Sequence, residues 1–265
     1  MVRAAALLVV FGLPAGAEAG ALQEADKVGK DKAPVVFRKM LADYQKKKGA
    51  EIAETTQLGL AQENSSTFQG VLRKDMAAVK GSAEIYAKGR NFIIRTGDRY
   101  DQAGNLRGPE SITAASFKNP AVMIADASRL LAGATYLNDD AVGGRDCKVI
   151  SLTADPRLLK EHLQEVAELV QKQLTGMARD LFSGNLTGYL DEKVSTSRYV
   201  LWVGKADLLL HKMEWVLEAE TKAASLPPGV QPFKVSLRSE VKFSKWDEDL
   251  PFDIPAPVKA RWGMR

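Results

Sequence analysis

The last third of the chain alternates apolar and polar side chains with a period of two, and this pattern limits the possible folds more than any other feature. In segment 233–243, apolar residues occupy every second position, broken only by Ser239. In segment 211–220, His211, Met213, Trp215 and Leu217 are expected to share one face. Successive side chains of a strand point to opposite faces of its sheet. Both segments are therefore predicted to be long antiparallel strands with one apolar and one solvated face.

Further strands are predicted upstream. Segment 197–203 precedes the strand at 211–220, and the turn residues Gly204 to Asp207 between them indicate a hairpin. From about 67 to 107 a two-residue rhythm is interrupted by turn signals such as Lys88-Gly89-Arg90, which is typical of a meander. Another strand is expected at 147–153. Strands that come as hairpins and meanders indicate an antiparallel sheet.

Helical periodicity appears in three places. Segment 155–182 has Asp155 as a natural N-cap, Pro156 in the first helical position and apolar residues spaced by three and four. One or two amphipathic helices are expected over 34–61, and two short helices, or a loop with one helix, over 112–137. The apolar stripe of 155–182 must lie on an apolar surface. We therefore predict an α+β fold: a curved, half-open antiparallel β-barrel or sheet with helices covering its concave apolar face.

The N-terminus resembles a secretory signal. Residues 1–19 contain an early positive charge, a short apolar run, Pro14 and then small residues, so they are predicted to be a signal peptide. A buried N-terminal helix is the alternative. A mobile polar spacer is expected over 20–33 and a single domain over 34–265. The predicted location is periplasmic or secreted.

Sequence motifs for catalysis or metal binding are lacking. The two histidines, His162 and His211, have no HxH or HExxH spacing, and the single Cys147 allows no disulfide within the chain. No nucleophile elbow, phosphate loop or dinucleotide fingerprint occurs. The net charge of +4 is spread along the chain and does not indicate nucleic-acid binding. We predict no enzymatic activity, no metal and no cofactor, with His211 partly buried and Cys147 half-buried.

Two segments resemble a known family. SRYVLWVGKADLLLHKMEW and VKFSKWDEDLPFDIPAP are similar to the strand–turn–strand and closing-strand signatures of the outer-membrane lipoprotein carrier (LolA/LolB/LppX-like) superfamily, best matched over residues 189–257. The residues that carry the resemblance are Tyr199, Leu201, Trp202, Lys212, Met213, Val241, Phe243, Ile254 and Pro255. The resemblance implies a half-open barrel, with helices as its lid, that holds acyl chains or a hydrophobic partner against its concave face.

The leading hypothesis is an exported, non-enzymatic binding protein that shields lipid or lipoprotein acyl chains. An envelope protein partner and transient contact with a membrane surface are further expectations. The predicted apolar lining is Met213, Trp215, Leu217, Val235, Leu237 and Val241, with Leu163, Val166 and Val170 as the lid. One alternative is an exported scaffold or adaptor with a dry core, which would bind a protein partner through Trp202 or Trp246. A hydrolase with a site assembled from distant residues is the other alternative.

Overall fold

The computed structural model describes residues 33–59, 63–102, 117–173, 186–226 and 231–264. The predicted signal peptide and all of the predicted spacer except Ala33 lie outside these ranges. Ala33 itself is the first residue of helix α2 and is fully buried.

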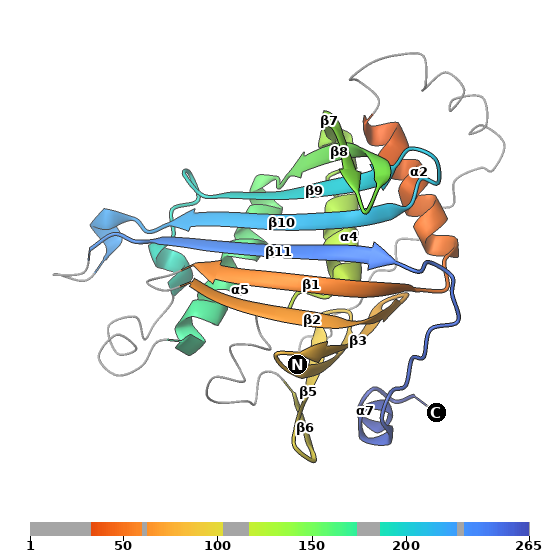
Figure 1. Cartoon of the computed structure of the whole chain (residues 1–265). Helices are drawn as coiled ribbons and strands as arrows, with labels where there is room; N and C mark the ends of the chain where they lie inside the picture. The colour runs from red at the N-terminus through yellow and green to blue at the C-terminus, as the bar shows by residue number, and fades with distance from the viewer. Residues whose placement is uncertain (1–32, 60–62, 103–116, 174–185, 227–230, 265) are drawn as a thin grey trace.

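Within the described ranges, eleven strands form one antiparallel sheet that does not close into a barrel (Figure 1). The strands are β1 (Ala50–Gly59), β2 (Glu63–Arg73), β3 (Met76–Gly81), β4 (Glu84–Lys88), β5 (Asn91–Thr96), β6 (Arg99–Gln102), β7 (Thr135–Val142), β8 (Arg145–Thr153), β9 (Thr196–Gly204), β10 (Leu210–Glu220) and β11 (Lys234–Ser244). Their order is β6-β5-β4-β3-β2-β1-β11-β10-β9-β8-β7. Strands β1–β6 form one meander and strands β7–β10 form another. The two are joined by β11, which pairs with β1 on one side and β10 on the other.

The helices are arranged around this sheet. They are α2 (Ala33–Lys46), α4 (Pro120–Ser128), α5 (Pro156–Gln173) and α7 (Ala256–Arg261), with 3₁₀ turns η3 (Leu131–Gly133), η4 (Leu186–Tyr189) and η5 (Ala223–Ser225). In Figure 1, α4 and α5 lie behind the sheet, α2 stands at one end of it, and α7 lies near β3–β6. Within the described ranges, no helix is both long and apolar enough to cross a membrane. The predicted α+β class, with helices over one face of an open antiparallel sheet, is confirmed.

The strands of the last third follow their alternation closely. In β11, Val235, Leu237, Ser239, Val241 and Phe243 are buried and the residues between them are mainly exposed. The meander of β2–β6 and the hairpin of β9 and β10 are also present as predicted. At the start of α5, the Leu158 N–H donates to the Asp155 carboxylate at 2.7 Å, so Asp155 caps this helix as expected. The predicted end of this helix, 174–182, lies outside the described residues.

One predicted helix is wrong in its second half. Helix α2 ends at Lys46, and the following residues form β1, which lies between β2 and β11 near the centre of the sheet. Strand β1 does alternate, because Ile52, Glu54, Thr56 and Leu58 are all buried. Two of these four buried side chains are polar, so the apolar rhythm that would have marked a strand is missing from the sequence.

Two smaller predictions also need correction. Residues 135–137, which fall in the segment 112–137 where short helices are predicted, begin the edge strand β7, and the side chains of this strand are mostly exposed. His211 does not share a face with Met213. Leu210 pairs with Val203 and Lys212 with Trp202, which makes His211 the extra residue of a β-bulge. Its side chain is buried rather than partly buried, and its Nε2 lies 3.0 Å from Asp207 Oδ2.

The opposite face of the sheet carries two smaller apolar clusters. Cys147 belongs to one of them and is fully buried rather than half-buried. The other contains Tyr86, Ile93, Ile254 and Val258, where α7 and the segment before it pack against β4 and β5. The main core therefore lies on the α4–α5 side of the sheet.

Candidate functional site: the interface between the sheet and helices α4 and α5

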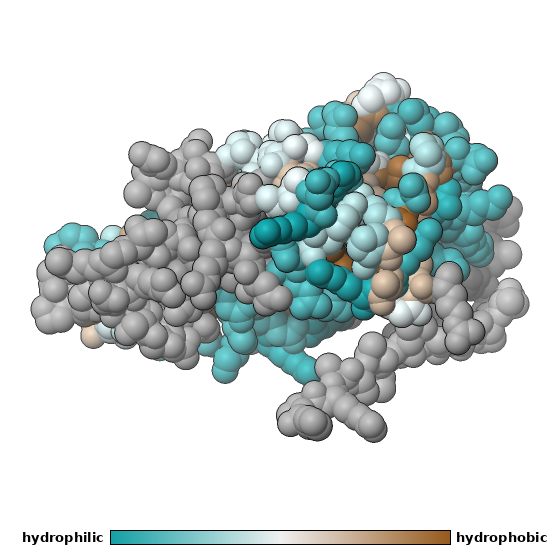
Figure 2. Space-filling model, turned by 90° about the horizontal axis from the view of Figure 1, so that it is seen from below, coloured by the Kyte–Doolittle hydropathy of each residue, from teal (hydrophilic) through white to brown (hydrophobic). Residues whose placement is uncertain are grey.

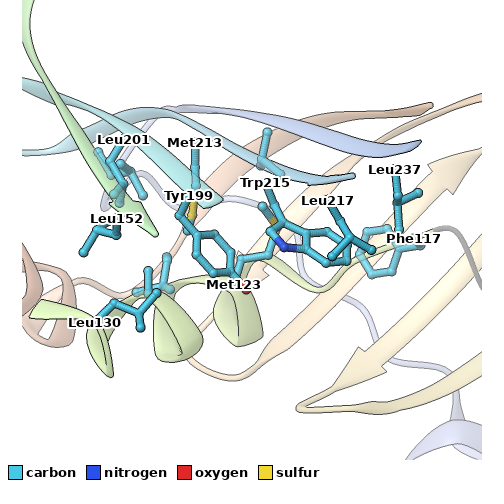
Figure 3. Close-up of a cluster of buried hydrophobic side chains, with 14 of the residues drawn as sticks. Phe117, Met123, Leu130, Leu152, Tyr199, Leu201, Met213, Trp215, Leu217 and Leu237 are labelled. Atoms are coloured by element: carbon cyan, nitrogen blue, oxygen red, sulfur yellow. The ribbon is translucent and has the colours of Figure 1, made fainter. Parts of the chain in front are cut away.

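The predicted lining and lid residues meet in one place. Eight of the nine belong to the same buried apolar cluster, and each of these eight is at most 5% exposed: Leu163, Val166, Met213, Trp215, Leu217, Val235, Leu237 and Val241. Val170 lies in α5, outside the residues whose side chains are described. In Figure 3, Met213, Trp215, Leu217 and Leu237 lie on the sheet side of this cluster.

Helix α4, which lies in the segment 112–137 where short helices are predicted, also covers this face, although none of its residues is among the predicted lid residues. Met123, Ile124 and Ala127 of α4 are buried in the same cluster, together with Phe117 and Leu130 on either side of the helix (Figure 3). Its start is signalled in the sequence, because Asn119 accepts a hydrogen bond from the Ala121 N–H and Pro120 follows it. We call α4 and α5 together the cover.

A buried carboxyl group lies where the cover meets the centre of the sheet. Glu54 of β1 is 1% exposed, and its Oε1 accepts hydrogen bonds from Ser239 Oγ at 2.8 Å, Thr56 Oγ1 at 3.0 Å and the Lys118 N–H at 3.0 Å. Its Oε2 is buried without a hydrogen-bond partner among the described residues. Burial raises the pKa of Glu54 from 4.5 to about 7, and the three hydrogen bonds offset part of that effect.

A chain of hydrogen bonds connects α5 to the sheet beneath it. Trp215 Nε1 donates to Ser197 Oγ at 2.9 Å, and Ser197 Oγ lies 2.7 Å from His162 Nδ1. His162 Nε2 is 3.1 Å from the Tyr199 hydroxyl, which donates to Asp126 Oδ2 at 3.5 Å. Every donor finds an acceptor when Ser197 donates to Nδ1 and the neutral imidazole carries its proton on Nε2. Burial lowers the pKa of His162, which favours this neutral form.

Ion pairs fasten the cover to the β4–β5 turn. Arg90 Nη2 donates to both carboxylate oxygens of Asp126 in α4, at 2.9 and 3.0 Å, and Arg90 also pairs with Glu165 of α5. Lys118 pairs with Glu165, and its ammonium lies 4.2 Å from the centre of the Trp215 ring. Burial would raise the pKa of Asp126, but its contact with His162 and the charges of Arg90 and Lys118 outweigh this and lower it. Asp126 is therefore a carboxylate at neutral pH.

Ser197, His162 and Asp126 superficially resemble the parts of a serine hydrolase site. However, Ser197 and His162 are at most 1% exposed, and Ser197 already accepts a hydrogen bond from Trp215. The carboxylate of Asp126 is 3.8 Å from His162 Nε2, with the Tyr199 hydroxyl in contact with both groups. A nucleophile must reach its substrate. This arrangement instead joins the cover to the sheet.

Two of the best-formed cavities among the described residues are not lined by the predicted site residues. One, of about 710 Å³, lies beside α7, and the other, of about 210 Å³, lies near Tyr44 and Trp246. No group of three or more potential metal-ligating side chains is found within the described ranges. The eight described lining and lid residues pack in one buried apolar cluster.

Sequence reasoning missed the polar residues of this interface. Glu54 lies in the segment predicted as helix, and Arg90 was read only as part of a turn. One signal was present: Ser239 is the single break in the apolar face of β11, and it is the side chain that bonds Glu54. A polar residue at an inward strand position indicates a buried polar partner.

No protein-family model matches the chain, and no curated protein matches it by sequence. Solved structures do match it. The lipoprotein LppX from Mycobacterium tuberculosis is 11% identical, with a TM-score of 0.42, and the match covers 83% of this chain and 98% of LppX. LprF from Mycobacterium bovis is 12% identical, with a TM-score of 0.37, and the match covers 86% of this chain and 97% of LprF.

A LolA superfamily protein from Nitrosomonas europaea is 11% identical, with a TM-score of 0.31, and the match covers 85% of this chain and 96% of that protein. The resemblance predicted from the sequence thus finds structural matches over most of the chain.

Proposed function

We propose that this chain is an exported, non-enzymatic binding protein that shields acyl chains of lipids or lipoproteins between the apolar sheet face and the cover. The observation that carries this proposal is that charged and polar side chains, rather than apolar ones alone, hold the cover on the sheet. Charged and hydrogen-bonded side chains tie α4 and α5 to the sheet: Arg90, Lys118, Asp126, His162 and Glu165.

Buried or half-buried ion pairs contribute little net stability, because removing charges from water costs about as much as their attraction returns. A permanently closed core would be at least as stable with apolar residues in these positions. If the cover must separate from the sheet, charged and polar side chains are favoured at their interface, because water can solvate them once the two surfaces are apart. We therefore infer that the interface between the sheet and the cover opens to admit a ligand.

The energy available is sufficient for such a site. Burying about ten methylenes of an acyl chain contributes about 8 kcal/mol, at about 0.8 kcal/mol each. Part of that energy would be spent on separating the cover and displacing the contacts of Met213, Trp215 and Leu217. The remainder sets the affinity, so a longer chain should bind more tightly than a shorter one.

The first test is native mass spectrometry of protein purified from its own host, combined with uptake of a fluorescent fatty-acyl probe. Met213→Trp should fill the site and abolish uptake, because Met213 is fully buried on the apolar face. Val216→Trp is the matched control, since this neighbour on β10 has its side chain on the other face and should leave uptake unchanged. Absence of both bound lipid and probe uptake in the wild-type protein would refute the proposal.

The adaptor alternative has one observation in its favour, which is that the eight described lining and lid residues form a filled core. Its two proposed anchors are already engaged. Trp202 donates to Asp140 at 2.9 Å and lies under the Lys212 ammonium, while Trp246 stacks on Phe243. A stable protein complex recovered without any lipid would favour this second function.

A further inference from the structure

The larger cavity has the chemistry of an anion site. It lies between the β2–β3 and β4–β5 turns, strands β5 and β6, and the C-terminal end of α7, and its volume is about 710 Å³. Ligand cavities of roughly 300–1,000 Å³ hold small organic molecules, so this one is far larger than a simple inorganic ion requires. Its lining includes three cations, Lys88, Arg90 and Arg261, and one carboxylate, Asp75.

The charges of this cavity do not balance internally. Arg90 is neutralised by the cover, because Arg90 and Lys118 together face Asp126 and Glu165. Among the described residues, neither Lys88 nor Arg261 has a carboxylate within ion-pair distance, and Asp75 likewise pairs with no cation. Two cations and one carboxylate leave one positive charge, so the cavity favours a ligand group with a single negative charge.

We propose that this cavity binds a phosphodiester, the anion carried by glycerophospholipid headgroups and by soluble glycerophosphodiesters. A phosphodiester bears one negative charge over two oxygens, which an arginine and a lysine can bind together. It also has an ester group on each side of the phosphorus, and these extend into a cavity too large for a carboxylate alone. Asn91 and Gln102 supply amides for a polyol, and Trp262 supplies an apolar surface.

The elements that line this cavity lie on the lower side of the molecule in Figure 1, near α7. Seen from below, the described surface is largely hydrophilic, with a few apolar patches (Figure 2). Arg90 connects the cavity to the cover, since this residue lines the cavity and its guanidinium binds Asp126 and Glu165. A phospholipid headgroup held here would therefore lie next to the helices that cover the apolar face. Binding of the headgroup itself does not depend on acyl binding.

The test uses the full chain and sn-glycero-3-phosphoglycerol, a headgroup without acyl chains, with binding measured by calorimetry and by NMR titration. Lys88→Gln and Arg261→Gln should each weaken binding about fivefold, because each removes one unpaired cation. Asp75→Asn should tighten binding at least about twofold, since it removes the one opposing charge. A gain of affinity cannot arise from a misfolded variant, so Asp75→Asn keeps the test independent of folding.

A second arm distinguishes the two sources of the phosphodiester. If dihexanoyl phosphatidylglycerol binds at least tenfold more tightly than the headgroup, with the same dependence on Lys88 and Arg261, the ligand of this cavity is a lipid. Equal affinities would identify a soluble phosphodiester. Absence of headgroup binding, or binding that none of the three variants alters, would overturn the inference. Uptake of the fatty-acyl probe by the same preparations reports separately on the proposed function.

Discussion

Replacing Glu54 by glutamine should make the protein more stable at alkaline pH, and the size of the gain follows from the environment of this carboxyl group. Burial raises the pKa of Glu54 from 4.5 to about 7. Each pH unit between these two values costs about 1.4 kcal/mol of folding free energy. Keeping Glu54 ionised in the folded protein at pH 8 therefore costs about 3 kcal/mol relative to the unfolded chain.

The direction of this effect is fixed by which state binds the proton more tightly. Because the pKa is higher in the folded state, the contribution of Glu54 to stability is fully present below about pH 4.5. This contribution is lost progressively as the pH rises to about 7, and the loss does not increase further above that pH. Glutamine keeps the shape of the side chain and an oxygen for Ser239, Thr56 and the Lys118 N–H, but it does not ionise.

The assay is urea unfolding of the wild-type protein and Glu54→Gln at pH 5, 6, 7 and 8. The difference in unfolding free energy between the two should move in favour of the variant by about 2.5 kcal/mol between pH 5 and pH 8. Glu51→Gln, the same substitution on the same strand at a partly exposed glutamate that pairs with Lys245 at 3.2 Å, is the matched control. Parallel curves for wild type and Glu54→Gln would refute the reasoning.

Three further predictions concern stability and accessibility. Asp126→Asn should lower the unfolding free energy by about 2 kcal/mol, since it leaves the Arg90 guanidinium with a weaker partner; a loss below about 0.5 kcal/mol in urea unfolding would contradict the role given to this ion pair. Gly70→Ala should lower the unfolding free energy by about 2 kcal/mol or more, and the melting temperature by several degrees, because the new Cβ would lie 2.0 Å from the Ala78 carbonyl oxygen. A calorimetric scan that matches the wild type would show that β2 and β3 move apart at this point without any loss of stability. The Cys147 thiol, which is fully buried and whose pKa is raised by that burial, should react with a thiol reagent only when the protein unfolds, so rapid labelling of the native protein would contradict its placement.

The amphipathic strands could be predicted from the sequence, and the polar interior could not. Strand β11 buries every second side chain, so its sequence pattern and its structure agree, and Met213, Trp215, Leu217 and Ala219 of β10 are buried in the same way. Strand β1 was missed because Glu54 and Thr56 occupy inward positions, where an apolar residue would have shown the period. Strand β7 was missed because an edge strand with exposed side chains has no apolar face to detect.

The candidate site was predictable only in its apolar part. The lining residues of β10 and β11 could be named, since each strand's inward face is visible in its own local pattern. The contacts of Arg90 with Asp126 and Glu165 join three separate segments of the chain. Local periodicity does not indicate which distant charges will meet, so this network required the three-dimensional structure.

The position of β11 also has a consequence for how the chain is made. This last strand fills the gap between β1 and β10, so neither meander has its neighbour until the C-terminal part of the polypeptide has been synthesised. Until then both β1 and β10 present open edges that can pair with other chains. Removing β11 would leave two separate half-sheets rather than a shortened version of this one. The chain must therefore reach its native state late and as a unit, which favours keeping it unfolded until synthesis is complete.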